Sequence, residues 1–160
     1  MVTRDTAWPA GTPCWVDLGA GDTAQAAAFY SGVFGWTVQP GMPEAGNYSM
    51  CEVGGQAVAG IGQKMSAEMP TVWTTYLASD DVDATVERVR AAGGQVVMEP
   101  MDVMEAGRMA IATDPGGAAF GIWQSGLHTG AGRANEPGSL IWNENMSRRS
   151  EEHTSELQSQ

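Results

Sequence analysis

Apolar and polar residues along this chain follow first a strand-like and then a helix-like period, and this order occurs twice. In each copy, a short apolar run with a tryptophan at or next to its first residue leads to an aspartate that opens a helical run. Asp22 and Gly35 bound the first helical run, and Asp81 and Gly94 bound the second with identical spacing. Such equal spacing indicates an internal duplication. A single unit is too short to bury its own apolar face, so we expect function to lie between the copies.

Each helical run has a start signal and an apolar stripe. Asp22 followed by Gln25 is an N-cap pattern, because the carboxylate accepts backbone N–H groups and the glutamine reaches back to the cap. The second run has a narrower stripe with charged residues between its apolar positions. The stripes consist of Ala26, Phe29, Tyr30, Val33 and Phe34 in the first run and Val82, Val86 and Val89 in the second. We interpret both helices as scaffolding.

Glycine-rich turns between extended segments predict the remaining strands. Gly54 and Gly55 separate two such segments between Asn47 and Gln63, which is a hairpin signal. The sequence Asp-Pro-Gly-Gly at 114–117 separates another pair. Each unit thus consists of one strand, one helix and three more strands. The predicted fold class is α+β, a domain with eight strands and two helices.

The predicted domain covers residues 12–124, with unit one at 12–64 and unit two at 71–124. Other segments are an N-terminal extension (1–11), a Gly-rich linker (125–138), a segment resembling the first strand of a third unit (139–148) and a polar tail (149–160). The tail has the sequence produced by in-frame translation of a widely used sequencing adapter, so we interpret it as an artefact. We therefore expect the intact protein to continue into a second domain, truncated here.

The composition argues against several classes of partner and site. The net charge of −11 argues against nucleic acid as a partner, because binding there relies on lysine and arginine at phosphates. No apolar run approaches the roughly 20 residues of a membrane span, and the N-terminus lacks a signal-peptide layout, which predicts a cytoplasmic protein without membrane contact. Cys14 and Cys51 are too few for a zinc-finger site, and we expect both to be buried free thiols.

Three motifs resemble the vicinal oxygen chelate superfamily, of the glyoxalase, bleomycin-resistance and dioxygenase type. They read GDTAQAAAFYSGVFGW, VDATVERVRAAGGQV and ATDPGGAAFGIW. The likeness is to the N-terminal half of tandem-domain glyoxalase-like proteins, often labelled hydroxylases. It implies paired βαβββ units that form a curved mixed sheet, a concave face that encloses the ligand, and a second domain of the same kind. Whether the truncated chain dimerises stays open.

The resemblance also implies where a divalent metal would be held. The four ligand positions fall on or next to Trp15, Gly60, Thr74 and Gly121. These side chains cannot coordinate a metal ion, because they offer only an indole, two glycines and one threonine hydroxyl. We therefore expect neither a metal nor another cofactor. The alternative is a metal-assisted lyase, isomerase or dioxygenase whose site is completed by the missing second domain. Whether the protein is an enzyme stays open; if it is, the resemblance implies a glyoxalase-like lyase or oxidoreductase.

Strand alternation predicts the lining of the concave face. Trp15 and Asp17 should point toward it, and Cys14, Val16 and Leu18 should pack under the helices. We predict that a small organic ligand is bound by Trp15, Asp17, Tyr76, Met104, Arg108 and Trp123. In this hypothesis Met104 belongs to a methionine-rich lid, and either Arg108 or a ligand cation pairs with Asp17. The alternative is that these residues form an ordinary core. His128 is expected to be a solvated linker side chain.

Overall fold

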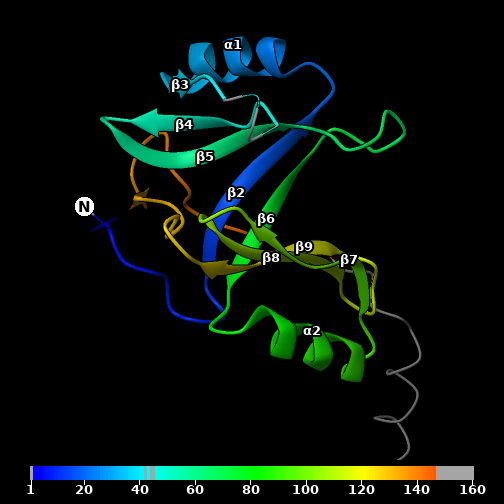
Figure 1. Cartoon of the computed structure of the whole chain (residues 1–160). Helices are drawn as coiled ribbons and strands as arrows, with labels where there is room; N and C mark the ends of the chain where they lie inside the picture. The colour runs from blue at the N-terminus through cyan, green and yellow to red at the C-terminus, as the bar shows by residue number, and fades with distance from the viewer. Residues whose placement is uncertain (1, 42, 44–45, 147–160) are drawn as a thin grey trace, which may run out of the picture.

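The structure, a computed structural model, describes residues 2–41, 43 and 46–146 (Figure 1). The adapter-like tail and the last residues of the predicted third unit lie outside the described residues. Within the described part of the chain, no helix combines the length and the apolar character that crossing a membrane requires.

Two βαβββ units follow one another, as the sequence predicts. The first consists of β2 (Pro13–Ala20), α1 (Thr23–Phe34), β3 (Thr37–Gln39), β4 (Ser49–Val53) and β5 (Gln56–Gln63). The second consists of β6 (Val72–Ala78), α2 (Val82–Ala91), β7 (Gln95–Val103), β8 (Gly107–Thr113) and β9 (Ala119–Ser125). In addition, β1 (Val2–Thr3) and β10 (Arg133–Ala134) form a separate antiparallel pair.

The eight strands of the two units form one sheet because β2 pairs with β6. The main sheet has eight strands in the order β3-β4-β5-β2-β6-β9-β8-β7. Strands β2 and β6 pair antiparallel, whereas the first and last strands of each unit, β2 with β5 and β6 with β9, pair parallel. The helices lie outside the curved sheet at its two ends (Figure 1). This mixed α+β architecture confirms the predicted fold class.

The helix ends form as their cap residues predict. The Asp22 carboxylate accepts a hydrogen bond from the Gln25 backbone N–H at 2.9 Å, and Gly35 ends α1 with a φ of 69°. Asp81 caps α2 through the Ala84 N–H at 2.9 Å. The C-terminal turn of α2 differs from expectation, because Ala92 is the cap and Gly93, with a φ of 83°, takes the left-handed conformation.

Three apolar clusters form the interior. One lies between α1 and the sheet around Leu18, Cys51 and Ile61, and a second lies between α2 and the sheet around Val86 and Ile122. The third lies on the concave face and consists of Cys14, Trp15, Tyr76, Ala78, Trp123 and Ala131.

Both cysteines are buried free thiols, as predicted. Burial raises the pKa of Cys14 to about 12 and that of Cys51 to about 11, so both stay protonated near neutral pH. The predicted location of Cys14 under a helix is wrong, since it belongs to the concave cluster together with its neighbour Trp15. The strand register shifts between Pro13 and Trp15, which breaks the simple alternation there.

Two glycines of the concave face make room for tyrosine rings. Gly60 pairs with Asp17, and Gly121 occupies the corresponding position beside Tyr76. A Cβ atom at Gly60 would overlap the Tyr48 hydroxyl group, and a Cβ atom at Gly121 would overlap the Tyr76 ring. Each unit therefore places a tyrosine ring over a glycine of its last strand.

We predict that Gly121→Ala destabilises the protein by about 1–3 kcal/mol, the usual cost of overpacking, because the new methyl group must displace the Tyr76 ring. The matched control is Gly32→Ala in α1, where the added Cβ meets no atom within 4 Å and helix propensity favours alanine by roughly 1 kcal/mol. Urea unfolding followed by tryptophan fluorescence measures both changes. Equal stabilities of Gly121→Ala and the parent protein would contradict the proposed packing.

Candidate functional site

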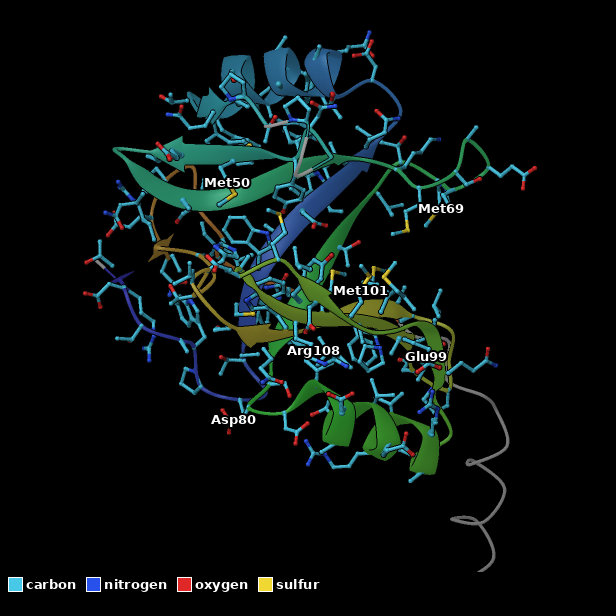
Figure 2. The ribbon with its side chains drawn as sticks, in the orientation of Figure 1. Met50, Met69, Asp80, Glu99, Met101 and Arg108 are labelled. Atoms are coloured by element: carbon cyan, nitrogen blue, oxygen red, sulfur yellow. The ribbon has the colours of Figure 1, made fainter. Side chains whose placement is uncertain are left out.

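Asp17 lies at the centre of the concave face, where the two units meet. On β2, Asp17 pairs with Gly60 of β5 on one side and with Thr74 of β6 on the other. The equivalent position of the second unit is Tyr76, which pairs with Trp15 and Gly121. Asp17 is partly buried. Side chains from both arms of the sheet extend into the space between them (Figure 2).

A chain of hydrogen bonds ends at the Asp17 carboxylate. The Trp15 indole Nε1–H donates to the Tyr48 hydroxyl oxygen at 2.8 Å, and the Tyr48 hydroxyl donates to Asp17 Oδ2 at 3.2 Å. The Tyr76 side chain also acts on this carboxyl group and lowers its pKa. Two phenols, one from each unit, therefore stabilise one carboxyl group.

Tyr48 is a site residue that the sequence pattern does not reveal, because there it belongs only to a predicted hairpin. It directly precedes β4, and its ring crosses to β5 over Gly60 and Gly62. These two glycines alternate along one face of the strand, which leaves room for a ring. That alternation is the signal that would have indicated an overlying aromatic side chain.

The surroundings of Asp17 raise the pKa of its carboxyl group toward neutral pH. Burial raises the pKa of its carboxyl to about 6, and the hydrogen bonds from Tyr76 and Tyr48 oppose this rise. Burial, assisted by the charge of Asp17, raises the pKa of both tyrosines above the ordinary value. The two phenols thus stay protonated donors while the carboxyl group can gain or lose a proton near neutral pH, as a general acid or base must.

His128 packs against the concave cluster near the N-terminal end of β2. Its imidazole meets the rings of Trp15 and Trp123 edge to face, with centroid distances of 4.4 and 5.5 Å. The Trp123 Nε1–H donates to the His128 backbone carbonyl at 3.0 Å. Within the described residues, the buried His128 Nε2 has no hydrogen-bond partner. Burial lowers the imidazole pKa to about 4, so the ring is neutral near pH 7.

The expectation of a solvated His128 is therefore wrong. The segment after β9 folds back onto the sheet, because the Ala131 N–H donates to the Cys14 carbonyl at 2.7 Å and the Gly132 N–H donates to the Ala57 carbonyl at 2.8 Å. These bonds hold the imidazole against the tryptophans. Part of the predicted linker thus belongs to the folded domain.

Four of the six predicted ligand residues lie together. Trp15, Tyr76 and Trp123 belong to the concave cluster, and Asp17 lies beside them on β2, hydrogen-bonded to Tyr48. Met104 is exposed in the turn between β7 and β8 and does not belong to this cluster. Other methionines face it instead, since Met50 and Met109 pack against the cluster from opposite arms of the sheet.

Arg108 does not pair with Asp17. Its Nε and Nη2 atoms donate to the Asp83 carboxylate, each at 2.9 Å, and its Nη1 donates to Asp102 at 2.9 Å. Arg108 alternates along β8 with Met109, which packs on the concave cluster, so the arginine points to the opposite face, toward α2 (Figure 2). The predicted arginine partner of Asp17 is thus replaced by phenol groups.

The four positions at which the resemblance places metal ligands do not fit a metal ion. Trp15 offers an N–H donor that is already bonded to Tyr48, and Thr74 offers a single hydroxyl. Tyrosine rings cover Gly60 and Gly121, which have no side chains of their own. Among residues 2–41, 43 and 46–146, no three His, Cys, Asp or Glu side chains are grouped as a metal site requires.

Longer curated proteins resemble this chain. The protein CFP32 of Mycobacterium bovis, which its name describes provisionally as a glyoxylase, is 48% identical over 139 residues, a match covering 84% of this chain and 53% of the relative. The anthracycline biosynthesis protein DnrV of Streptomyces peucetius is 42% identical over 152 residues, covering 86% of this chain and 55% of the relative. The chain thus spans about half the length of these relatives.

Solved structures support the fold. Streptomyces coelicolor methylmalonyl-CoA epimerase superposes with a TM-score of 0.56 at 17% identity, covering 73% of this chain and 96% of that protein. At this identity the likeness concerns the fold alone. Residues 14–122 match the Glyoxalase/Bleomycin resistance protein/Dioxygenase superfamily, and the chain belongs to that superfamily.

Proposed function

We propose that the concave face binds a small organic molecule directly, without a metal ion, and that Asp17 anchors it. The observation that carries this proposal is a partly buried carboxyl group between two tyrosines, at the junction of the two units. Its side-chain hydrogen bond comes from the neutral Tyr48 hydroxyl group, and no ion pair joins it to a cation of the described chain. An ionised carboxylate in such surroundings is stabilised by a cation, which a ligand can supply.

The surrounding side chains favour an aromatic or cationic ligand. Trp15, Tyr48 and Tyr76 place aromatic rings around the carboxyl group, a residue set that suits stacking and cation–π contacts. Met50 and Met109 add flexible apolar surface from the two arms of the sheet. The name of the Streptomyces peucetius relative places that protein in anthracycline biosynthesis, which makes an anthracycline a rational first probe.

The first prediction for this site concerns ligand affinity. An aromatic cation should quench tryptophan fluorescence saturably, and Asp17→Asn should weaken its binding by about 1–3 kcal/mol, because a charged hydrogen-bond partner is lost. Trp15→Ala should weaken neutral and charged ligands alike, since it removes contact area. Asp102→Asn is the matched control, because Asp102 pairs with Arg108 on the other face of the sheet. A broad ligand screen that leaves the melting temperature of the two-domain protein unchanged would contradict the proposal.

A second prediction concerns pH. Binding of a quaternary ammonium probe should weaken as pH falls through about 6, because protonation removes the negative charge of Asp17. The loss approaches about tenfold per pH unit below that value if binding needs the ionised form. Tyr48→Phe should move the midpoint to higher pH, since its hydrogen bond lowers the pKa of Asp17. Titrations at several pH values measure this, and a pH-independent affinity in the parent protein would refute the role of Asp17.

The third prediction separates this proposal from a metal-assisted reaction. Elemental analysis of the purified, tag-free protein should find no stoichiometric zinc, nickel or iron after dialysis, because the four expected ligand positions offer no donor set. Weak binding by surface carboxylates is removed by dialysis and serves as the internal control. A tightly held equivalent of metal in the concave face would show that the site works differently.

A further inference from the structure

The two helices of this protein have opposite surface characters. Helix α2 buries Val82 and Val86 against the sheet and presents charged residues to solvent, as an amphipathic surface helix should. Helix α1 has no charged residue at all, and none of its residues is buried. Its exposed positions include the large apolar side chains Phe29, Val33 and Phe34. A helix that is apolar around its circumference normally lies inside a protein or an interface.

Aromatic rings extend this apolar area from α1 onto the outer side of the sheet. Tyr30 is the hub, with ring centroids 5.0 Å from Phe29, 6.1 Å from Phe34, 5.8 Å from Trp36 and 5.1 Å from Trp73. The exposed fraction is 60% for Phe29, 54% for Val33, 49% for Phe34 and 38% for Trp73. We call the set Phe29, Tyr30, Val33, Phe34, Trp36 and Trp73 the outer aromatic surface. Contiguous exposed aromatic groups of this kind mark interaction sites.

The chain after β10 runs along the border of the outer aromatic surface. The Trp36 Nε1–H donates to the Gly138 carbonyl at 2.7 Å. Farther along, the Thr75 hydroxyl donates to the Asn143 side-chain carbonyl at 2.7 Å, two positions from Trp73 on the same face of β6. Between these contacts Ile141 and Trp142 are exposed, Trp142 to 77%. The segment that leads away from the domain therefore adds apolar side chains next to the surface.

We propose that the outer aromatic surface is the docking site for the second half of the longer protein that the relatives represent. The relatives contain nearly as much chain again as this sequence matches. A half that follows residue 146 would be tethered beside the surface, and a short tether raises its effective concentration there. The lack of charge on α1 fits a permanent, apolar interface within one protein. This proposal concerns a different face from the ligand site and does not depend on it.

The test compares two proteins by hydroxyl-radical footprinting of Phe29, Phe34 and Trp73. One is the 160-residue chain, and the other joins residues 1–146 to the part of the Mycobacterium bovis relative beyond the matched segment. We expect oxidation of the three residues to be several-fold slower in the joined protein. Val33→Lys should restore the rates, whereas Val97→Lys, the same change at a side chain 63% exposed on β7, should not.

Far-UV circular dichroism checks that both halves are folded, and Phe29→Lys provides a second variant should Val33→Lys unfold α1. Unchanged oxidation in a folded joined protein would overturn the proposal. Concentration-dependent protection in the 160-residue chain, accompanied by a doubling of its mass in sedimentation, would overturn it as well, because a second copy would then be the occupant. Protection that survives both lysine variants would place the interface elsewhere and has the same consequence.

Discussion

The antiparallel pairing of β2 with β6 is the constraint on which the rest of this structure depends. It joins the two units into one sheet and places Asp17 and Tyr76, which occupy equivalent positions in the two units, on neighbouring strands. Because each first strand also pairs with the last strand of its own unit, the same register brings Gly60 and Gly121 to the centre of the concave face. The candidate site is thus a consequence of how the units are joined.

Glycine and tyrosine together give this concave face its chemistry. The two glycines stand where the superfamily resemblance places metal ligands, and tyrosine rings occupy the space that ligand side chains would need. The phenols reach Asp17, and burial brings the pKa of this carboxyl to about 6. A proton-exchanging carboxyl group between two neutral donors thereby occupies the middle of the site. This arrangement offers hydrogen bonds and a variable charge to a ligand, where a metal centre would offer open coordination positions.

The two faces of the sheet differ in chemical character. On the concave side, apolar rings surround one ionisable group, and the segment after β9 closes the cluster through His128 and Ala131. On the outer side, α2 forms charged contacts such as Asp83 with Arg108, while α1 presents uncharged aromatic surface. This difference between two helices with the same origin in the repeat is the basis for assigning α1 to an interface.

The sequence alone determined the elements and their order, because caps, turns and apolar periods are local. Asp22, Asp81 and the Gly54-Gly55 turn specify their structures through neighbouring backbone groups, so the βαβββ repeat and the inward orientation of Trp15 and Asp17 were predictable. Only the tertiary structure decided the partners of Asp17. Tyr48 reaches it across β5, Arg108 turns away to Asp83, and His128 is held by a segment that folds back. These contacts join residues distant in sequence, and their geometry depends on sheet register and packing, which no local pattern encodes.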